Sequence, residues 1–354
     1  MPWENNDVFY FFHRLRGGQV MSAPPLVVRC GAFGDVVMVT PMIRLLAARY
    51  QGKVDVIGSG GWTAPLLQHE PALGHLQMLS SRTTPYWLCP SQWQLVRWLR
   101  QRGRGPVYLC DTDPKIGALL QRAGLLEDDI VRRLPSDDEV NGITCLWPDR
   151  WISMGQRDPA RDYGARHDIQ AHTFRLPQLV VTDAARAEFV QWRAESGLKG
   201  PLVLFQPGNK RTHKRGGLAT RQHPKFWPPE HWAAVAQAVW KKLPEAQIVL
   251  CGSPLEHPVL EEIRTAAGHD PRMHNGAHEL PIPRLLAMIE QSHSLVSVDT
   301  GPAHAAAALG CPLVVLYGAA SPKKWRPLGP ATILTLGGEK GEQSRVSDIP
   351  VEDV

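Results

Sequence analysis

The sequence has few cysteines and no long apolar run near its start. Its six cysteines are scattered over 354 residues, and no two of them form a Cys-x-x-Cys pair. This spacing fits neither a disulfide framework nor a zinc knuckle, and it favours a reducing cytoplasm. Residues 8–12 are the only apolar or aromatic run before His13, which is too short for a signal peptide or a membrane span. We therefore expect a cytoplasmic protein.

Residues 1–25 are expected to precede the fold as an N-terminal extension. Met21 directly precedes "SAPPLVVRCGAFGD", which has the pattern of a strand and loop that open a Rossmann-like domain. Residues 1–20 are therefore either an N-terminal extension or the result of a start codon assigned upstream of Met21. If it is an extension, the segment is either a disordered tail or a segment whose aromatic and basic side chains contact a membrane surface.

Length and charge suggest two domains and an anionic partner. A chain of 354 residues that is 43% hydrophobic can form two separate cores. The net charge of +5 is explained either by an anionic ligand, glycan or lipid headgroup, or by a basic solvated surface. The stretch 209–229 is basic and has no acidic residue, but no RNA-type motif supports a nucleic-acid partner. Its cations are Lys210, Arg211, Lys214, Arg215, Arg221 and Lys225.

Strand and helix patterns alternate along the chain and predict an α/β fold. Residues 26–30 form an apolar strand pattern, followed by the loop "GAFGD" and an amphipathic helix over 36–50. The alternation continues through the first half and restarts at "PLVLFQPG", residues 201–208. Two doubly wound parallel sheets are the simplest account. We place the domains at 26–178 and 179–354, with the boundary after an aperiodic stretch rich in Pro, Asp, Arg and Trp.

Unusual residues follow several of the predicted strands. Ligands of open parallel sheets bind at the carboxyl ends of the strands, and two facing sheets can line one cleft with those ends. The residues expected there are Gly34, Asp35, Gly208, Gly252, Ser253 and 299–304.

The segment "VDTGPAHAAAALG" has more polar groups at its helix start than capping requires. Pro302 suits the first helical position, so the helix N-terminus can bind a diphosphate. Asp299 is expected to bind sugar hydroxyls, with His304 one turn further on as a hydrogen-bond donor. In the alternative interpretation Asp299 only caps the helix and His304 is an ordinary surface residue.

Two other residues are candidates for chemistry and phosphate binding. The loop "GAFGD" lacks the third glycine of GxGxxG and has an acid where a dinucleotide would lie, which disfavours a nicotinamide enzyme. Asp35 at a helix start can serve as a general base, or it is simply a residue of the first turn. Lys225, just before a helix that begins with proline, can reach a phosphate at the end of the preceding strand.

Several motifs resemble glycosyltransferase family 9, the ADP-heptose:lipopolysaccharide heptosyltransferases of Gram-negative bacteria. The resemblance runs from about residue 26 to the end and is most specific in "GDVVMVTP", "KFWPPEHW", "SVDTGPAHAAAALGCPLVVLYG" and "SPKKWRPLG". It implies a GT-B fold, in which two Rossmann-like domains face an interdomain cleft. It also implies inverting transfer of heptose from ADP-heptose to a glycan hydroxyl, such as lipopolysaccharide core, with no metal and no cofactor. The motif "DTD" at 111–113 is similar to a metal-binding DxD, but the two-Rossmann pattern disfavours that role.

The resemblance assigns roles to individual residues. Asp35 corresponds to the catalytic base, and the donor side includes Gly208, Lys225, Glu256 at the ribose, Leu280 at the adenine, and Asp299, Thr300, Gly301 and His304. Lys115 and Arg82 are the candidates for holding an anionic glycan or glycolipid acceptor. Peripheral contact with the inner membrane would accompany such an acceptor.

The family assignment leaves other functions open at this stage. A GT-B transferase could use another nucleotide sugar, or a protein or secondary metabolite as acceptor, and a non-catalytic nucleotide-sugar binder would share much of the pattern. The sequence departs from the family in a longer, more basic loop after Gly208. It also ends at "VSDIPVEDV", where the family usually continues into a helix, so a longer natural chain is an expectation.

Overall fold

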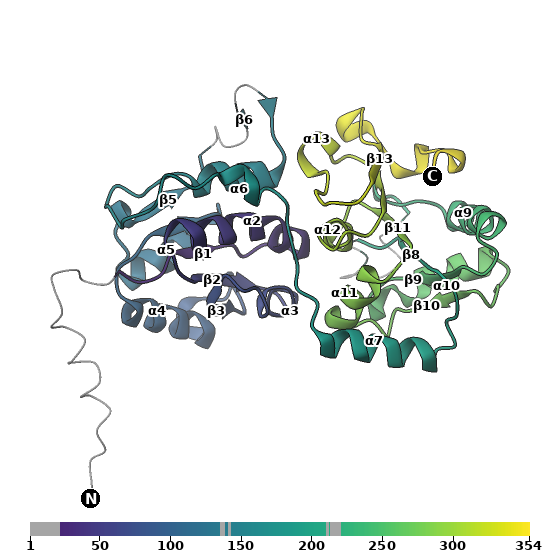
Figure 1. Cartoon of the computed structure of the whole chain (residues 1–354), viewed down its shortest axis with the longest axis horizontal. Helices are drawn as coiled ribbons and strands as arrows, with labels where there is room; N and C mark the ends of the chain where they lie inside the picture. Colours follow the sequence, from purple (N-terminus) through teal and green to yellow (C-terminus); the bar gives the residue numbers. More distant parts are fainter. Residues whose placement is uncertain (1–21, 135–138, 141–142, 210–211, 213–220) are drawn as a thin grey trace, which may run out of the picture.

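The structure is a computed structural model that describes residues 22–134, 139–140, 143–209, 212 and 221–354. The predicted extension up to residue 21 and the cations Lys210, Arg211, Lys214 and Arg215 lie outside the described residues. Two α/β halves lie side by side (Figure 1).

The first half contains a five-stranded sheet in the order β3-β2-β1-β4-β5, with every neighbouring pair parallel. The two central strands are completely buried, as expected for a sheet covered by helices on both faces. Its strands are β1 (Leu26–Val28), β2 (Val54–Ser59), β3 (Leu73–Leu79), β4 (Val107–Leu109) and β5 (Ile130–Arg132). Its helices are α2 (Phe33–Arg49), α3 (Thr63–Leu67), α4 (Pro90–Arg102), α5 (Pro114–Ala123) and α6 (Trp147–Gly155), and the short strands β6 (Glu139–Val140) and β7 (Ile143–Thr144) pair with each other.

The second half contains a six-stranded parallel sheet in the order β10-β9-β8-β11-β12-β13. Its strands are β8 (Leu202–Gln206), β9 (Gln247–Leu250), β10 (Met273–Asn275), β11 (Ser294–Val298), β12 (Leu313–Tyr317) and β13 (Ile333–Gly337). Its helices are α7 (Asp183–Glu195), α9 (Pro229–Lys242), α10 (His257–Ala266), α11 (Ile282–Glu290), α12 (Gly301–Ala308) and α13 (Pro322–Trp325). The predicted α/β class with two parallel sheets is confirmed.

The main differences from the sequence prediction are a helix and the four edge strands of the two sheets. Helix α6 lies in the stretch that showed no periodicity, yet Trp147, Trp151 and Met154 form one buried face of it. Strands β3, β5, β10 and β13 were also not predicted, because their sequences are short or mix polar residues and glycine with apolar ones. In the described part of the chain, no helix is both long and apolar enough to cross a membrane.

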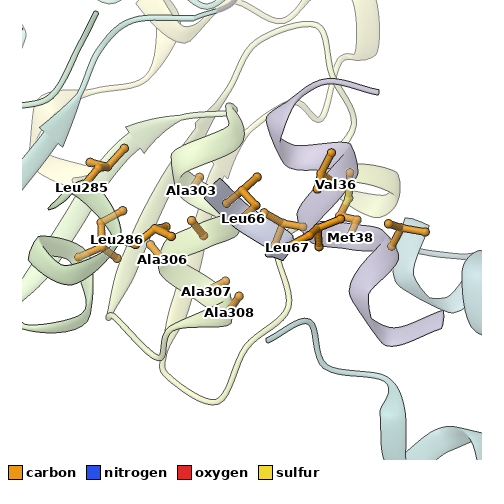
Figure 2. Close-up of a cluster of buried hydrophobic side chains, with 14 of the residues drawn as sticks. Val36, Met38, Leu66, Leu67, Leu285, Leu286, Ala303, Ala306, Ala307 and Ala308 are labelled. Atoms are coloured by element: carbon orange, nitrogen blue, oxygen red, sulfur yellow. The ribbon is translucent and has the colours of Figure 1, made fainter. Parts of the chain in front are cut away.

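One hydrophobic cluster joins the two halves. Figure 2 shows side chains from α2 and α3 close to side chains from α11 and α12. The alanines of α12 are buried because this helix lies between its own sheet and α2. Small side chains let the two helices approach closely, which explains the alanine-rich sequence. The labelled residues of the cluster are Val36, Met38, Leu66, Leu67, Leu285, Leu286, Ala303, Ala306, Ala307 and Ala308.

Candidate functional site

A cavity of about 230 Å³ lies between the halves, beside the N-terminus of α12. Ala32, Phe33 and Gly34 line it from the first half, next to the start of α2. Among its other lining residues are five that the sequence predicted for the donor: Gly208, Glu256, Leu280, Thr300 and Gly301. The fold therefore brings these five together from four separate loops.

Two glycines allow the first turns of α2 and α12 to touch. A Cβ atom added to Gly34 would lie 2.9 Å from His304 Cδ2, and one added to Gly301 would lie 2.7 Å from Phe33 Cβ. Separations below 3.0 Å require something to shift, so a side chain at either position would push the helix starts apart. The glycines thus set the width of the cavity between the halves.

Glu256 is buried at the cavity wall and held by three donors. Its Oε2 accepts hydrogen bonds from Ser253 N at 2.8 Å and Ser253 Oγ at 2.9 Å, while Thr212 Oγ1 donates to Oε1. A Cβ atom on Gly208 would lie 2.0 Å from Glu256 Oε1, so a larger residue there would force the carboxylate to shift. The carboxylate is therefore fixed in direction before any ligand arrives.

Asp35 lies in the first turn of α2, at the edge of a second cavity. Its Oδ2 accepts from Ala32 N at 2.7 Å, and its Oδ1 forms an ion pair with Arg29 Nη2 at 2.7 Å. The second cavity has a volume of about 540 Å³ and is lined by Asp35, Arg82 and the polar loop 80–83. Ala32 and Trp62 line both cavities, so the two spaces adjoin at these two residues.

The two acceptor candidates differ in position. Arg82 lines the larger cavity, where its Nη1 lies 3.6 Å from both Asp111 Oδ2 and Asp113 Oδ2. Lys115 is exposed at the start of α5, and it is not among the described residues that line this cavity. The acids of "DTD" are already engaged, because Asp111 accepts from Cys30 N and Asp113 caps α5 through Lys115 N.

Lys225 and Asp299 form an ion pair. Lys225 Nζ lies 2.8 Å from Asp299 Oδ2 and also donates to the Asp299 carbonyl oxygen. Asp299 is buried, and Lys225 is three-quarters covered. The lysine ammonium therefore lies at the end of β11, next to the start of α12.

His304 is a buried residue with 5% exposure, so the alternative of an ordinary surface histidine is wrong. Its ring touches Gly34 of the opposite half. Burial lowers the pKa of His304, with the Lys225 charge acting in the same direction, while Asp299 and Asp35 oppose the shift. The imidazole is consequently neutral at pH 7 and still has one N–H to donate.

The depressed pKa of His304 predicts a loss of stability in mild acid. Its folded-state pKa lies below the ordinary value of 6.5, so the unfolded chain takes up the proton more readily. The contribution of the neutral His304 ring to the free energy of unfolding is complete above pH 6.5 and is lost as the pH falls towards the folded-state pKa. Urea unfolding from pH 7.5 to 5 should show this decline, with a slope of at most about 1.4 kcal/mol per pH unit from this group. His304→Gln should have a flatter profile, and equal slopes in the two proteins would contradict the assignment.

Comparison with known proteins identifies the family of this site. Residues 184–350 match glycosyltransferase family 9 (heptosyltransferase), and this range contains every predicted donor residue. Lipopolysaccharide heptosyltransferase 2 of Escherichia coli is 27% identical over 319 residues, which cover 86% of this chain and 85% of the relative. The C-terminal half of the chain thus matches glycosyltransferase family 9.

Solved structures support the fold along nearly the whole length of the chain. The structure of Escherichia coli ADP-heptose lps heptosyltransferase II has a TM-score of 0.72 at 24% identity, and covers 93% of this chain and 95% of its own. Escherichia coli heptosyltransferase WaaC with ADP has a TM-score of 0.61 at 16% identity, and the match covers 93% of this chain and 97% of that one. The predicted GT-B fold is confirmed.

Three residues of this site were given no individual role by sequence reasoning. Arg29 is the ion-pair partner of Asp35, and its guanidinium also lies 5.3 Å from the centre of the Trp151 ring. Phe33 and Trp62 form cavity walls, and Trp62 Nε1 donates to Gly31 O at 3.2 Å. Position alone could have indicated Arg29, which is at the end of the first strand pattern. No local signal distinguishes Trp62 from a core tryptophan.

Proposed function

We propose that this protein is an inverting, metal-independent heptosyltransferase that moves heptose from ADP-heptose to a hydroxyl of a glycan acceptor such as lipopolysaccharide core. The observation that carries the proposal is the pair of adjoining cavities. One is lined by the predicted donor residues, the other by Asp35 and polar side chains, and they share Ala32 and Trp62. The names of the relatives, including heptosyltransferase WaaC with ADP, support the choice of donor and acceptor.

The smaller cavity has a suitable group for each part of an ADP-sugar. Leu280, Ile282 and Leu285 form an apolar wall for the adenine. The Glu256 carboxylate can accept hydrogen bonds from ribose hydroxyls. The N-terminus of α12 attracts the diphosphate through its dipole and its free N–H groups.

The transfer itself needs one base and stabilisation of a leaving diphosphate. Asp35 takes the proton of the acceptor hydroxyl, whose oxygen attacks the anomeric carbon from the face opposite the diphosphate. The bond between that carbon and the phosphate oxygen breaks, and ADP leaves with the electron pair. Lys225 and the α12 N-terminus stabilise the developing charge, since preorganised cations and dipoles are strong in a cavity that excludes water.

The larger cavity suits a polar, anionic acceptor. Ser80, Ser81 and Thr83 offer hydroxyl groups to sugar oxygens, and Arg82 supplies a positive charge. Arg82 is 36% exposed and only 3.6 Å from its two carboxylates, so an acceptor phosphate can compete for it.

The direct test is incubation with ADP-heptose and a heptose-free or truncated lipopolysaccharide core, with the product mass measured. We expect one added heptose, inverted configuration at the new linkage, and undiminished turnover in EDTA. Calorimetry should show tighter binding of ADP than of UDP or GDP. Absence of heptose transfer, or turnover that requires Mg²⁺ or Mn²⁺, would contradict the proposal.

Gly208→Ala should weaken ADP binding. The added methyl group would overlap Glu256 Oε1 and force the carboxylate away from the cavity wall. Loss of one charged hydrogen bond corresponds to about 1.5–3 kcal/mol, or roughly 10- to 150-fold in the dissociation constant measured by calorimetry. Gly117→Ala is the matched control, because a Cβ atom there meets nothing within 4 Å. Equal ADP affinity in both variants would remove Glu256 from the donor site.

A further inference from the structure

Three large apolar side chains are exposed together at the start of α4. Trp87 is 70% exposed and Leu88 55%, both in a short 3₁₀ helix (Tyr86–Leu88), and Trp93 is 45% exposed on α4. Trp93, Arg97 and Arg100 lie at helical spacing on the exposed face of α4, opposite the buried Leu95, Val96 and Leu99. We call Trp87, Leu88, Trp93, Arg97, Arg100 and Arg122 the docking face.

Hydrogen bonds and a cation–π contact hold the docking face as one surface. Trp93 Nε1 donates to Tyr86 O at 2.6 Å, which fixes the indole against the 3₁₀ helix. The Arg122 guanidinium lies 4.2 Å from the centre of the Tyr86 ring, and Arg100 Nη2 donates to Arg122 O at 2.9 Å. These contacts join α4, α5 and the 3₁₀ helix, so the apolar and cationic groups keep fixed relative positions.

The surrounding charge is strongly positive. Between residues 80 and 126 the sequence has seven cations and two acids, Asp111 and Asp113, which both face Arg82. Arg102 pairs with Asp55 and Arg104 with Asp129, while Arg97, Arg100, Lys115 and Arg122 have no ion-pair partner among the residues that the structure describes. Arg97 is also exposed. Exposed tryptophans surrounded by arginines match a surface of anionic headgroups over an apolar layer, because the indole prefers that boundary and each cation adds electrostatic attraction.

We propose that the docking face binds the surface of an anionic membrane. This inference rests on the proposed function, because the proposed function supplies the lipid-anchored acceptor. Helix α4 lies at the lower outer edge of the first half, away from the sheet of the second half (Figure 1).

The docking face is connected directly to the acceptor cavity. Gln92 Nε2 donates to Ser81 O at 3.0 Å and to Thr84 O at 2.9 Å, so the first turn of α4 holds the loop that lines the cavity. Ser91 Oγ also accepts from Ser80 N at 3.1 Å. A protein resting on this face would thus have its acceptor cavity close to the headgroup layer, within reach of a membrane-anchored glycan.

The test is flotation of the full chain with phosphatidylcholine vesicles, with and without phosphatidylglycerol. We expect binding only to the anionic vesicles, falling about tenfold or more in Trp87→Ser/Leu88→Ser and in Arg97→Glu. Val190→Ser, exposed on α7, and Lys241→Glu, exposed on α9, are the matched controls and should bind like the unmodified chain. Melting temperatures check that each variant is folded.

The outcome does not depend on whether heptose is transferred, because vesicle binding uses neither donor nor acceptor. If transfer does occur, the docking-face variants should keep full kcat/KM on a lipid-free acceptor and lose it on an acceptor embedded in vesicles. The proposal is overturned by equal binding to both vesicle types, by no binding, or by variants that bind like the controls. It is also overturned if the same substitutions dissolve a dimer in gel filtration, since the face would then contact a second copy of the chain.

Discussion

Asp35→Asn should abolish most turnover while leaving ADP affinity nearly unchanged. General-base catalysis contributes about 10²- to 10⁴-fold, so kcat should fall within that range. The amide keeps the shape of the carboxylate and can still accept from Ala32 N, and the predicted donor residues lie in the other half. The measurements are steady-state kinetics with ADP-heptose and calorimetry with ADP.

Asp35→Asn also removes the ion pair with Arg29, and the experiment must distinguish this structural effect from the loss of the catalytic base. Asp183→Asn is the matched control, because Asp183 also lies in the first turn of a helix and pairs with an arginine, Arg186, at 2.8 Å. The control should keep full activity. If Asp35→Asn retains more than about a tenth of normal turnover, the site has a donor cavity but no identified base.

Lys225→Ala should lower kcat/KM for the donor by roughly 10- to 150-fold. A charge-assisted contact to phosphate is worth about 1.5–3 kcal/mol. The substitution also leaves the buried Asp299 carboxylate without its cation, so that its negative charge faces the incoming diphosphate. Both effects act in the same direction, and they should appear in donor kinetics and in ADP calorimetry.

A double variant separates the two effects of Lys225. Lys225→Ala/Asp299→Asn removes the unpaired charge, so any recovery relative to Lys225→Ala measures repulsion, and the remaining loss measures direct binding. Lys241→Ala, an exposed lysine of α9, is the control for charge alone. Unchanged kinetics in Lys225→Ala would transfer the phosphate role to another cation of the stretch 209–229.

Local patterns were sufficient for most of the fold. Apolar runs such as Leu202–Gln206 become buried central strands, and helices α9 and α12 begin near the prolines that indicated them. The edge strands β3, β5, β10 and β13 and helix α6 escaped prediction because they are short or partly polar, so that pairing and packing decide their structure. Strand β10, for example, has only three residues and is held by its register with β9.

The site also has features that local sequence patterns indicated and features that only the tertiary structure decided. The sequence determined which groups could act: Asp35 at a helix start, Lys225 before another, and a helix N-terminus at residues 300–302, because capping and strand-end rules are local. Tertiary structure alone decided that Lys225 pairs with Asp299 and Asp35 with Arg29. It also buried His304 against Gly34, which the alanine-rich helix could not reveal by itself. Arg29 and Asp35 meet across one strand-to-helix turn, and Lys225 and Asp299 come from segments 74 residues apart in the second half. Only the contact of His304 with Gly34 requires the two halves to pack together, because burial depends on side chains that are distant in the sequence.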